Sequence, residues 1–160
     1  LSGDPVLYRS EPAIDHDWGA DTPAPGIVNH DNFSARWTRT VNFANSGSYR
    51  FKATTDDGMR VWVDNVMIID AWYDSLAHTV EATVDLTAGN HYLVVEYYEA
   101  GGNARAGVTW EQINGSGGGD NGGGGGNGRF HPIFVAINRF TIPDWLFADA
   151  GKLAFTQHGH

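Results

Sequence analysis

Residues 47–65, GSYRFKATTDDGMRVWVDN, carry the two signals that decide the fold. On both sides of a central Asp-Asp-Gly, apolar and polar residues alternate, and Val, Tyr, Phe and Trp are frequent, which is typical of β-strands. The Asp64-Asn65 pair favours a tight hairpin, because both residue types tolerate the left-handed backbone conformation. The stretch therefore predicts two strands that meet near 56–58, followed by a hairpin into a third strand.

The same pattern extends over residues 31–113, where short strands rich in Val, Thr, Tyr and Trp are separated by turn residues. No amphipathic helix of useful length interrupts them, so we expect an all-β fold, an antiparallel sandwich or jelly roll. Residues 1–30 contain Pro5, Pro12, Pro23 and Pro25 and are expected to be irregular. The expected strands are 34–43, 47–56, 59–65, 66–72, 78–86, 91–99 and 107–112, with a second turn at 88–90.

Composition narrows the range of possible functions. The chain of 160 residues is 41% hydrophobic, enough for a real core, and its net charge of -9 would repel a phosphate backbone, which argues against nucleic-acid binding. It has no Cys, so disulfides and thiolate zinc sites are impossible. No apolar run is long enough to cross a bilayer.

The Asp56-Asp57-Gly58 segment is the strongest chemical signal. Neighbouring side chains of a regular strand point to opposite faces, but in a tight loop both carboxylates can converge on one point. Two converging carboxylates repel each other unless a cation lies between them, and a hard, oxygen-seeking ion such as Ca²⁺ suits them. The alternative is a simple polar turn, for which Asp and Gly are also common.

Residues 18–110 resemble the protective-antigen-type (PA14) domain family in the order and spacing of their motifs. The resemblance rests on these segments: Trp18-Gly19, FSARWT at 33–38, GSYRF at 47–51, DDGMRVWVDN at 56–65, IIDAW at 68–72, DLTAGNHYLVVEYYE at 85–99 and VTW at 108–110.

This resemblance implies an extracellular β-sandwich that is often used as a carbohydrate-binding module. In lectin-like members of the family, an Asp-Asp pair joined by a cis peptide holds Ca²⁺, and the ion binds sugar hydroxyls. Asp56 and Asp57 match that pair, and Asn103, in the segment 99–107, matches the ligand from a second loop. Trp72 and Tyr73 are candidates for stacking on a bound sugar, with a core position as the alternative for Trp72.

Signals of catalysis are lacking. The seven His have no metal-ligand spacing, no Gly-x-Ser-x-Gly elbow is present, and Ser75 near His78 has no nucleophile context. Glycosidases place their two carboxylates across a cleft, which adjacent residues such as Asp56 and Asp57 do poorly. We therefore expect a chain that is not an enzyme.

The C-terminal part differs in composition from the rest. We expect a domain at 1–113, a flexible glycine-rich linker at 114–128 and an apolar tail at 129–160, with a short helix at 143–151 and a final strand in KLAFTQ. The tail is too short to form its own core. The residues expected to dock it are apolar: Phe130, Ile133, Phe134, Val135, Ile137, Phe140, Ile142 and Trp145.

Three destinations for the tail are open: its own sandwich, a neighbouring copy as a donated strand, or a larger parent chain. The long tether favours the second, which predicts a head-to-tail filament or surface polymer of identical copies. The function predicted first is therefore an extracellular structural or adhesion subunit with a Ca²⁺ site. The alternatives are a monomeric Ca²⁺-dependent lectin module with its tail packed in cis, and an accessory sugar-binding domain of a glycosidase.

Overall fold

The structure is a computed structural model that describes residues 1, 3–113 and 152–157, and in the last segment only the side chain of Phe155. Every strand pairing among these residues is antiparallel, and they contain no helix. The strands are β1 (Leu7–Arg9), β2 (Ile14–Gly19), β3 (Phe33–Phe43), β4 (Gly47–Asp56), β5 (Gly58–Val63), β6 (Val66–Ala71), β7 (His78–Leu86), β8 (Gly89–Glu99), β9 (Ala104–Ile113) and β10 (Lys152–Gln157).

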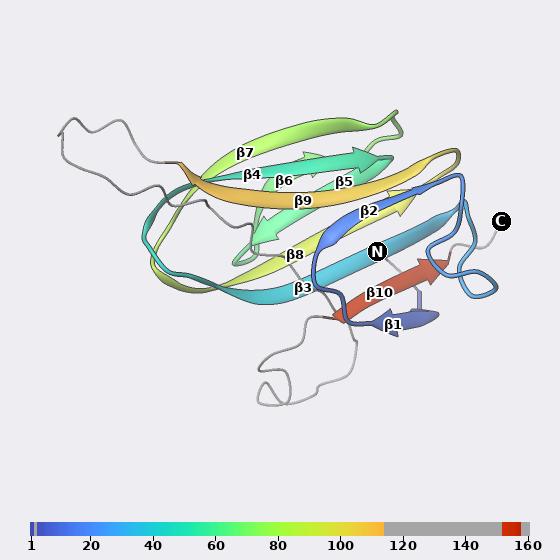
Figure 1. Cartoon of the computed structure of the whole chain (residues 1–160), viewed down its shortest axis with the longest axis horizontal. Helices are drawn as coiled ribbons and strands as arrows, with labels where there is room; N and C mark the ends of the chain where they lie inside the picture. Colours follow the sequence, from blue (N-terminus) through green and yellow to red (C-terminus); the bar gives the residue numbers. More distant parts are fainter. Residues whose placement is uncertain (2, 114–151, 158–160) are drawn as a thin grey trace.

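The strands form two layers, which confirms the predicted all-β sandwich (Figure 1). One sheet has the order β1-β10-β3-β8-β5-β6, and the other has the order β2-β9-β4-β7. The chain changes sheet at every connection between successive strands except that from β5 to β6. The crossing from β4 to β5, at the Asp-Asp-Gly segment, and the crossing from β6 to β7 lie at the same end of the sandwich, because β5 and β6 are paired antiparallel neighbours.

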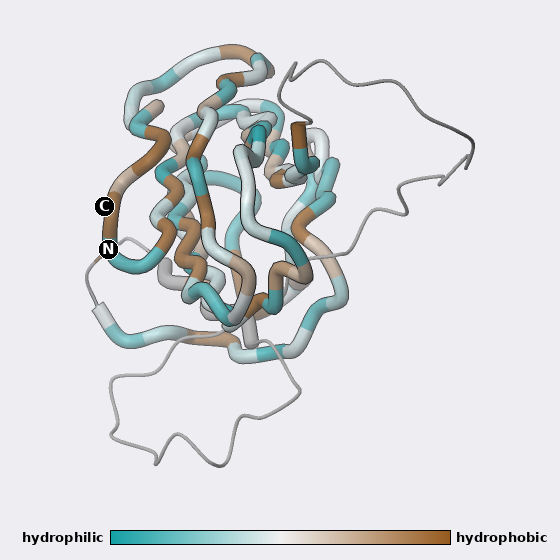
Figure 2. The backbone as a smooth tube through the Cα atoms, turned by 90° about the vertical axis from the view of Figure 1, so that its left-hand side faces the viewer, coloured by the Kyte–Doolittle hydropathy of each residue, from teal (hydrophilic) through white to brown (hydrophobic). Residues whose placement is uncertain are grey.

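The core forms because inward and outward residues alternate along the strands, a pattern visible as alternating hydropathy along the backbone (Figure 2). In β8, the inward residues Leu93, Val95 and Tyr97 are buried, and Glu99 continues the same inward series. The largest fully buried side chains are aromatic or aliphatic: Trp37, Tyr97, Phe33, Phe51, Phe155, Ile14 and Met59.

The two predicted turns are present. Asp64 and Asn65 have φ angles of 50° and 66° and join β5 to β6, and Gly89, with φ 129°, lies where β8 begins. The Asp64 carboxylate accepts a hydrogen bond of 2.8 Å from the backbone N–H of Tyr92, which ties the hairpin to β8.

The prediction that residues 1–30 are irregular is wrong for β1 and β2. β2 has a weak strand signal because half of its sequence, IDHDWG, is polar, including the inward position 16. Its inward residue His16 is accommodated by a buried acid: the His16 Nε2 atom lies 2.9 Å from Glu11 Oε2, and Trp37 Nε1 donates to the same oxygen at 3.1 Å. Because the polar atoms of His16 and Glu11 have hydrogen-bond partners, a polar residue can occupy this inward position, where the strand pattern leads one to expect an apolar residue.

The predicted strand in KLAFTQ is confirmed as β10, and it pairs within its own chain, which is the first of the three destinations and not the donation to a neighbouring copy that the long tether favours. β10 lies between β1 and β3 of the same chain (Figure 1), and Phe155 pairs with Leu7 on one side and Ala35 on the other. The Phe155 ring is fully buried, with its centroid 6.1 Å from those of Trp18 and Phe33. β10 therefore occupies the position between β1 and β3 in the six-stranded sheet of its own chain.

The remaining predictions for the tail fall outside the described residues. These are the linker at 114–128, the helix at 143–151 and the apolar docking residues Phe130, Ile133, Phe134, Val135, Ile137, Phe140, Ile142 and Trp145.

Candidate functional site

The Asp56-Asp57 pair lies where β4 passes into β5, and the peptide bond between the two residues is cis, as the family resemblance implies. Both aspartates are largely buried, with exposed fractions of 6% and 5%. The Thr55 hydroxyl donates to the carbonyl oxygen of Asp57 at 2.9 Å, and the Tyr97 hydroxyl bonds to the carbonyl oxygen of Asp56. The backbone of the pair is therefore held by side chains from β4 and β8.

Backbone amides from two loops orient the carboxylate of Asp57. The N–H of Ser75 donates to Asp57 Oδ1 at 2.8 Å, and the N–H of Ala100 donates to Asp57 Oδ2 at 3.0 Å. The backbone of Ala77 opposes the rise in the pKa of Asp56 that burial and Asp57 cause. The β6–β7 loop and the β8–β9 loop thus meet at the aspartates and present them at one end of the sandwich.

A third acid, Glu99, is buried close to the pair, with an exposed fraction of 1%. Its Oε2 atom lies 3.0 Å from the Tyr97 hydroxyl, whereas its Oε1 atom has no hydrogen-bond partner among the described residues. Tyr97 has one hydroxyl hydrogen and two acceptors around it, the Asp56 carbonyl and Glu99. A protonated Glu99 would donate to the phenol oxygen and satisfy both contacts.

The electrostatics of the site favour a positive charge. Burial, and then the neighbouring carboxylate of Asp57, raise the pKa of Asp56. Burial is also the largest cause that raises the pKa of Glu99, to about 7; the Tyr97 hydrogen bond opposes it, and the charges of Asp57 and Asp56 add to it. A bound cation would relieve the repulsion that these carboxylates exert on one another.

The donor types at this site fit Ca²⁺, which prefers carboxylate, amide and carbonyl oxygens. Asp56 and Asp57 would hold the ion, and Asn103 lies exposed in the β8–β9 loop that also supplies the Ala100 amide. Within residues 1, 3–113 and 152–157, no group of three or more His, Asp or Glu side chains is assembled as a metal site. Further ligands would therefore have to be amide or backbone carbonyl oxygens.

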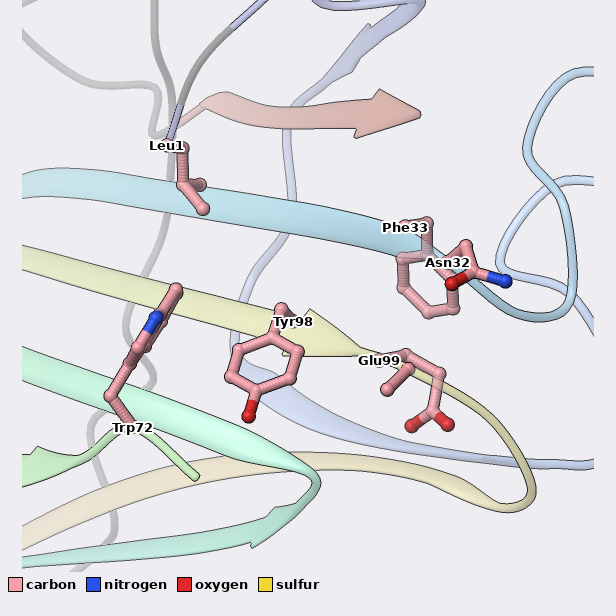
Figure 3. Close-up of a pocket in the computed structure, with 7 residues that line it drawn as sticks. Leu1, Asn32, Phe33, Trp72, Tyr98 and Glu99 are labelled. Carbon is pink, nitrogen blue, oxygen red and sulfur yellow. The ribbon is translucent and has the colours of Figure 1, made fainter. Parts of the chain in front are cut away.

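Trp72 lies at the surface end of the site and outside the buried core. It is half-buried, its ring centroid is 4.7 Å from that of Tyr98, and the Arg60 guanidinium lies 4.6 Å over its ring. The Tyr98 hydroxyl donates to Asp74 Oδ1 at 2.6 Å. Figure 3 shows Tyr98 between Trp72 and Glu99, in a hollow of about 540 Å³ lined by Leu1, Asn32, Phe33, Trp72, Tyr98, Glu99 and Ala100.

Tyr73 is 52% exposed on the β6–β7 loop. Its hydroxyl lies 3.0 Å from His78 Nε2, and the two rings are stacked with centroids 5.5 Å apart. The loop thus holds Tyr73 in one orientation, while much of the residue faces solvent.

Sequence reasoning missed most of the groups that support the aspartates. The amides of Ser75 and Ala100 have no sequence signature, because any residue except Pro supplies one. Glu99 did have a signal: the two-residue period of β8 places it on the inward face with Leu93 and Tyr97, where an unpaired acid is unusual.

No helix among the described residues is long and apolar enough to span a membrane.

Three relatives are similar to this chain. The curated anti-sigma-I factor RsgI3 of Acetivibrio thermocellus is 41% identical over 105 residues, which cover 65% of this chain and 16% of that protein. A solved structure of an anti-sigma factor domain-containing protein from Clostridium clariflavum is 34% identical with a TM-score of 0.60, and covers 66% of this chain and 36% of that one. The PA14 sugar-binding domain from an RTX adhesin shares the fold, with 15% identity, a TM-score of 0.55, and coverage of 66% and 69%.

The chain thus spans about a sixth of the length of the curated relative. The PA14 domain model matches residues 1–120, three quarters of the chain, and the match includes the Asp56-Asp57 pair, its two supporting loops and nine of the ten strands described above. The chain belongs to the PA14 domain family.

Proposed function

We propose that this chain is a non-catalytic recognition domain that binds carbohydrate through a Ca²⁺ ion held by Asp56 and Asp57. The observation that carries the proposal is the convergence of two backbone amides, from Ser75 and Ala100, on the buried carboxylate of Asp57, beside the equally buried Asp56. These bonds fix the orientation of the Asp57 carboxylate without neutralising it, so that a cation could still bind there.

The ion would supply open coordination positions that sugar hydroxyls can occupy. Asp56 and Asp57 would bind the ion, and Asn103, in the β8–β9 loop, would be a further ligand. Tyr73 offers an exposed aromatic ring to the sugar. One protein that shares the fold is a sugar-binding domain of an adhesin, which is in keeping with this proposal.

The domain would act outside the cell, as adhesins do, and within a longer protein. Because the chain matches only a sixth of an anti-sigma factor, a saccharide-recognition role would belong to one part of such a protein. Because β10 completes the sheet of its own chain, the pairing favours a monomeric domain over a head-to-tail polymer.

A glycan-binding assay tests the proposal. The protein is applied to immobilised neutral and acidic polysaccharides in Ca²⁺ or in EGTA, as wild type, as Asp57→Asn and as the control Asp70→Asn, which alters an exposed carboxylate paired with Arg60. We expect the wild type and the control to bind at least one glycan in Ca²⁺ only, and Asp57→Asn to bind none. No binding in Ca²⁺, or equal binding in EGTA, would refute the proposal.

A further inference from the structure

Three connections between strands, β3–β4, β5–β6 and β7–β8, lie at the end of the sandwich opposite to Asp56 and Asp57 (Figure 1). His91 lies among them, near the start of β8, where the two-residue period of the strand places it on the same face as Leu93. Its side chain is 11% exposed. A titratable ring is therefore largely enclosed where the chain passes between the two sheets.

Both ring nitrogens of His91 face hydrogen-bond acceptors. Nδ1 lies 2.5 Å from Oδ2 of Asp64 in the β5–β6 turn, and Nε2 lies 2.9 Å from the carbonyl oxygen of Thr87 in the β7–β8 connection. A carbonyl oxygen and an ionised carboxylate can only accept, so each ring nitrogen must carry a hydrogen for both bonds to form. The geometry therefore requires the doubly protonated, positively charged imidazolium.

Asp64 is the charged group that faces this ring. The other neighbours are neutral: the Phe43 ring of β3 meets His91 edge-on with centroids 5.5 Å apart, and the Thr87 hydroxyl lies 3.4 Å from Nε2. The hydrogen bond to Asp64 is the largest cause that raises the pKa of His91; burial opposes it, and the Thr87 carbonyl and the charge of Asp64 add to it. Asp64 stays ionised, because the N–H of Tyr92 and then His91 lower its pKa against the effect of burial.

The peptide unit between Thr87 and Ala88 is held on both sides. Its carbonyl oxygen accepts from His91, and its N–H donates to Ser46 Oγ, in the β3–β4 connection, at 2.7 Å. The imidazolium therefore links this peptide unit, and through it the β3–β4 connection, to the β5–β6 turn.

We propose that His91 is a proton-dependent latch, which holds the β7–β8 connection to the β5–β6 turn while its ring is charged and releases it when the ring is neutral. A neutral imidazole has one ring hydrogen, and the carboxylate of Asp64 keeps it on Nδ1, because a charge-assisted hydrogen bond is the stronger of the two. Nε2 then carries a lone pair that faces the Thr87 carbonyl oxygen, and two acceptors repel each other. The Thr87–Ala88 peptide unit keeps its bond to Ser46 and loses the one to His91.

The latch closes at low pH and opens at high pH. The ordinary pKa of a histidine is 6.5, and the folded protein raises that of His91. The stability that the latch contributes is therefore fully present below pH 6.5 and is lost as the pH rises through the higher pKa of the folded state.

Nuclear magnetic resonance of the full chain tests the latch. The ring ¹⁵N shifts of His91 distinguish the imidazolium from each neutral tautomer, and the variant His91→Gln identifies the signal by its loss. The protection factor of the Ala88 amide, which is corrected for the intrinsic effect of pH on hydrogen exchange, reports whether the Thr87–Ala88 peptide unit is held. Both are followed from about pH 5 to about pH 9, across the titration of histidine.

The wild type is compared with Asp64→Asn and with the control Asp70→Asn. Asn tolerates the φ angle of 50° at position 64, and its side-chain oxygen can still accept the N–H of Tyr92, so the turn is kept while the charge is removed. Asp70 is an exposed carboxylate of the same hairpin, paired with Arg60.

We expect both ring nitrogens of the wild type to be protonated below pH 6.5, with a midpoint above 6.5. As the ring loses its proton, protection of the Ala88 amide should fall by about fivefold, the effect of one ordinary hydrogen bond. Asp64→Asn should lower the midpoint toward 6.5, and Asp70→Asn should leave it unchanged. The latch is overturned by a midpoint at or below 6.5, by a midpoint that Asp64→Asn does not lower, or by Ala88 protection that does not follow the titration of His91.

Discussion

The ring of Tyr98 lies directly against the backbone of Gly58. A Cβ atom placed on Gly58 would be 2.1 Å from Cε1 of Tyr98 and 2.8 Å from its Cδ1 and Cζ atoms, which is closer than any real contact. Tyr98 cannot easily move aside, because its hydroxyl is bonded to Asp74 and its ring packs on Trp72. Gly58 is therefore required because any side chain at this position would clash with the Tyr98 ring. Through this contact, the aspartate pair that precedes Gly58 is packed against Tyr98 and Trp72.

The first prediction follows from this contact. Gly58→Ala should lower the free energy of unfolding by about 1–3 kcal/mol, the usual penalty for inserting a carbon into a packed site, as measured by urea denaturation. Gly101→Ala is the control, because its added Cβ would meet only Asp31 Cγ at 4.0 Å. Equal stability of the two variants would show that Tyr98 does not rest on Gly58.

The second prediction concerns β10. Phe155 is fully buried and packs on Trp18, Phe33 and Trp37, so Phe155→Ala should lower the free energy of unfolding by about 3–5 kcal/mol. Because β10 pairs within its own chain, the unfolding midpoint of the wild type should not depend on protein concentration. A midpoint that rises with concentration would instead indicate a strand exchanged between copies.

The third prediction uses the buried acid Glu99. Its pKa is raised from the ordinary 4.5 to about 7, so the folded protein binds a proton there that the unfolded chain releases. The associated stability is fully present below about pH 4.5 and is lost as pH rises through 7. Glu99→Gln cannot titrate at this position. Between pH 5 and pH 8, its free energy of unfolding should therefore rise relative to that of the wild type by about 2–3 kcal/mol.

The measurement is the unfolding free energy of both proteins across that pH range, in EGTA so that no cation replaces the proton. The difference between wild type and variant isolates Glu99 from the other titrating groups, such as Glu11, Asp64 and His91. Parallel curves would mean that Glu99 is ionised throughout and that the Tyr97 hydrogen goes to it rather than to Asp56.

Most of the sandwich could be predicted because inward and outward residues alternate along much of its central strands. β7 reads HTVEATVDL, with alternate residues less exposed along its length, and β4 and β7 have the predicted bounds. β1 and β2 could not be predicted, since one has three residues and the other places His16 inward against Glu11. The partner of β10 could not be predicted either, because nothing in KLAFTQ specifies which sheet edge it joins.

The candidate site, like the fold, could be predicted from the sequence only in part. Asp56 and Asp57 could be found from their motif, because two adjacent acids before a glycine are a chemical signal in any fold. The support from Ser75 and Ala100 consists of backbone amides, whose use depends on loop geometry alone.

Calorimetric titration of the protein with Ca²⁺ tests the central claim, that Asp56 and Asp57 hold a cation, most directly. Wild type and Asp70→Asn should bind one ion with the same affinity, and Asp57→Asn should show no binding heat, because it replaces a carboxylate oxygen with an amide group. An absence of heat in the wild type, or unchanged binding by Asp57→Asn, would contradict the account.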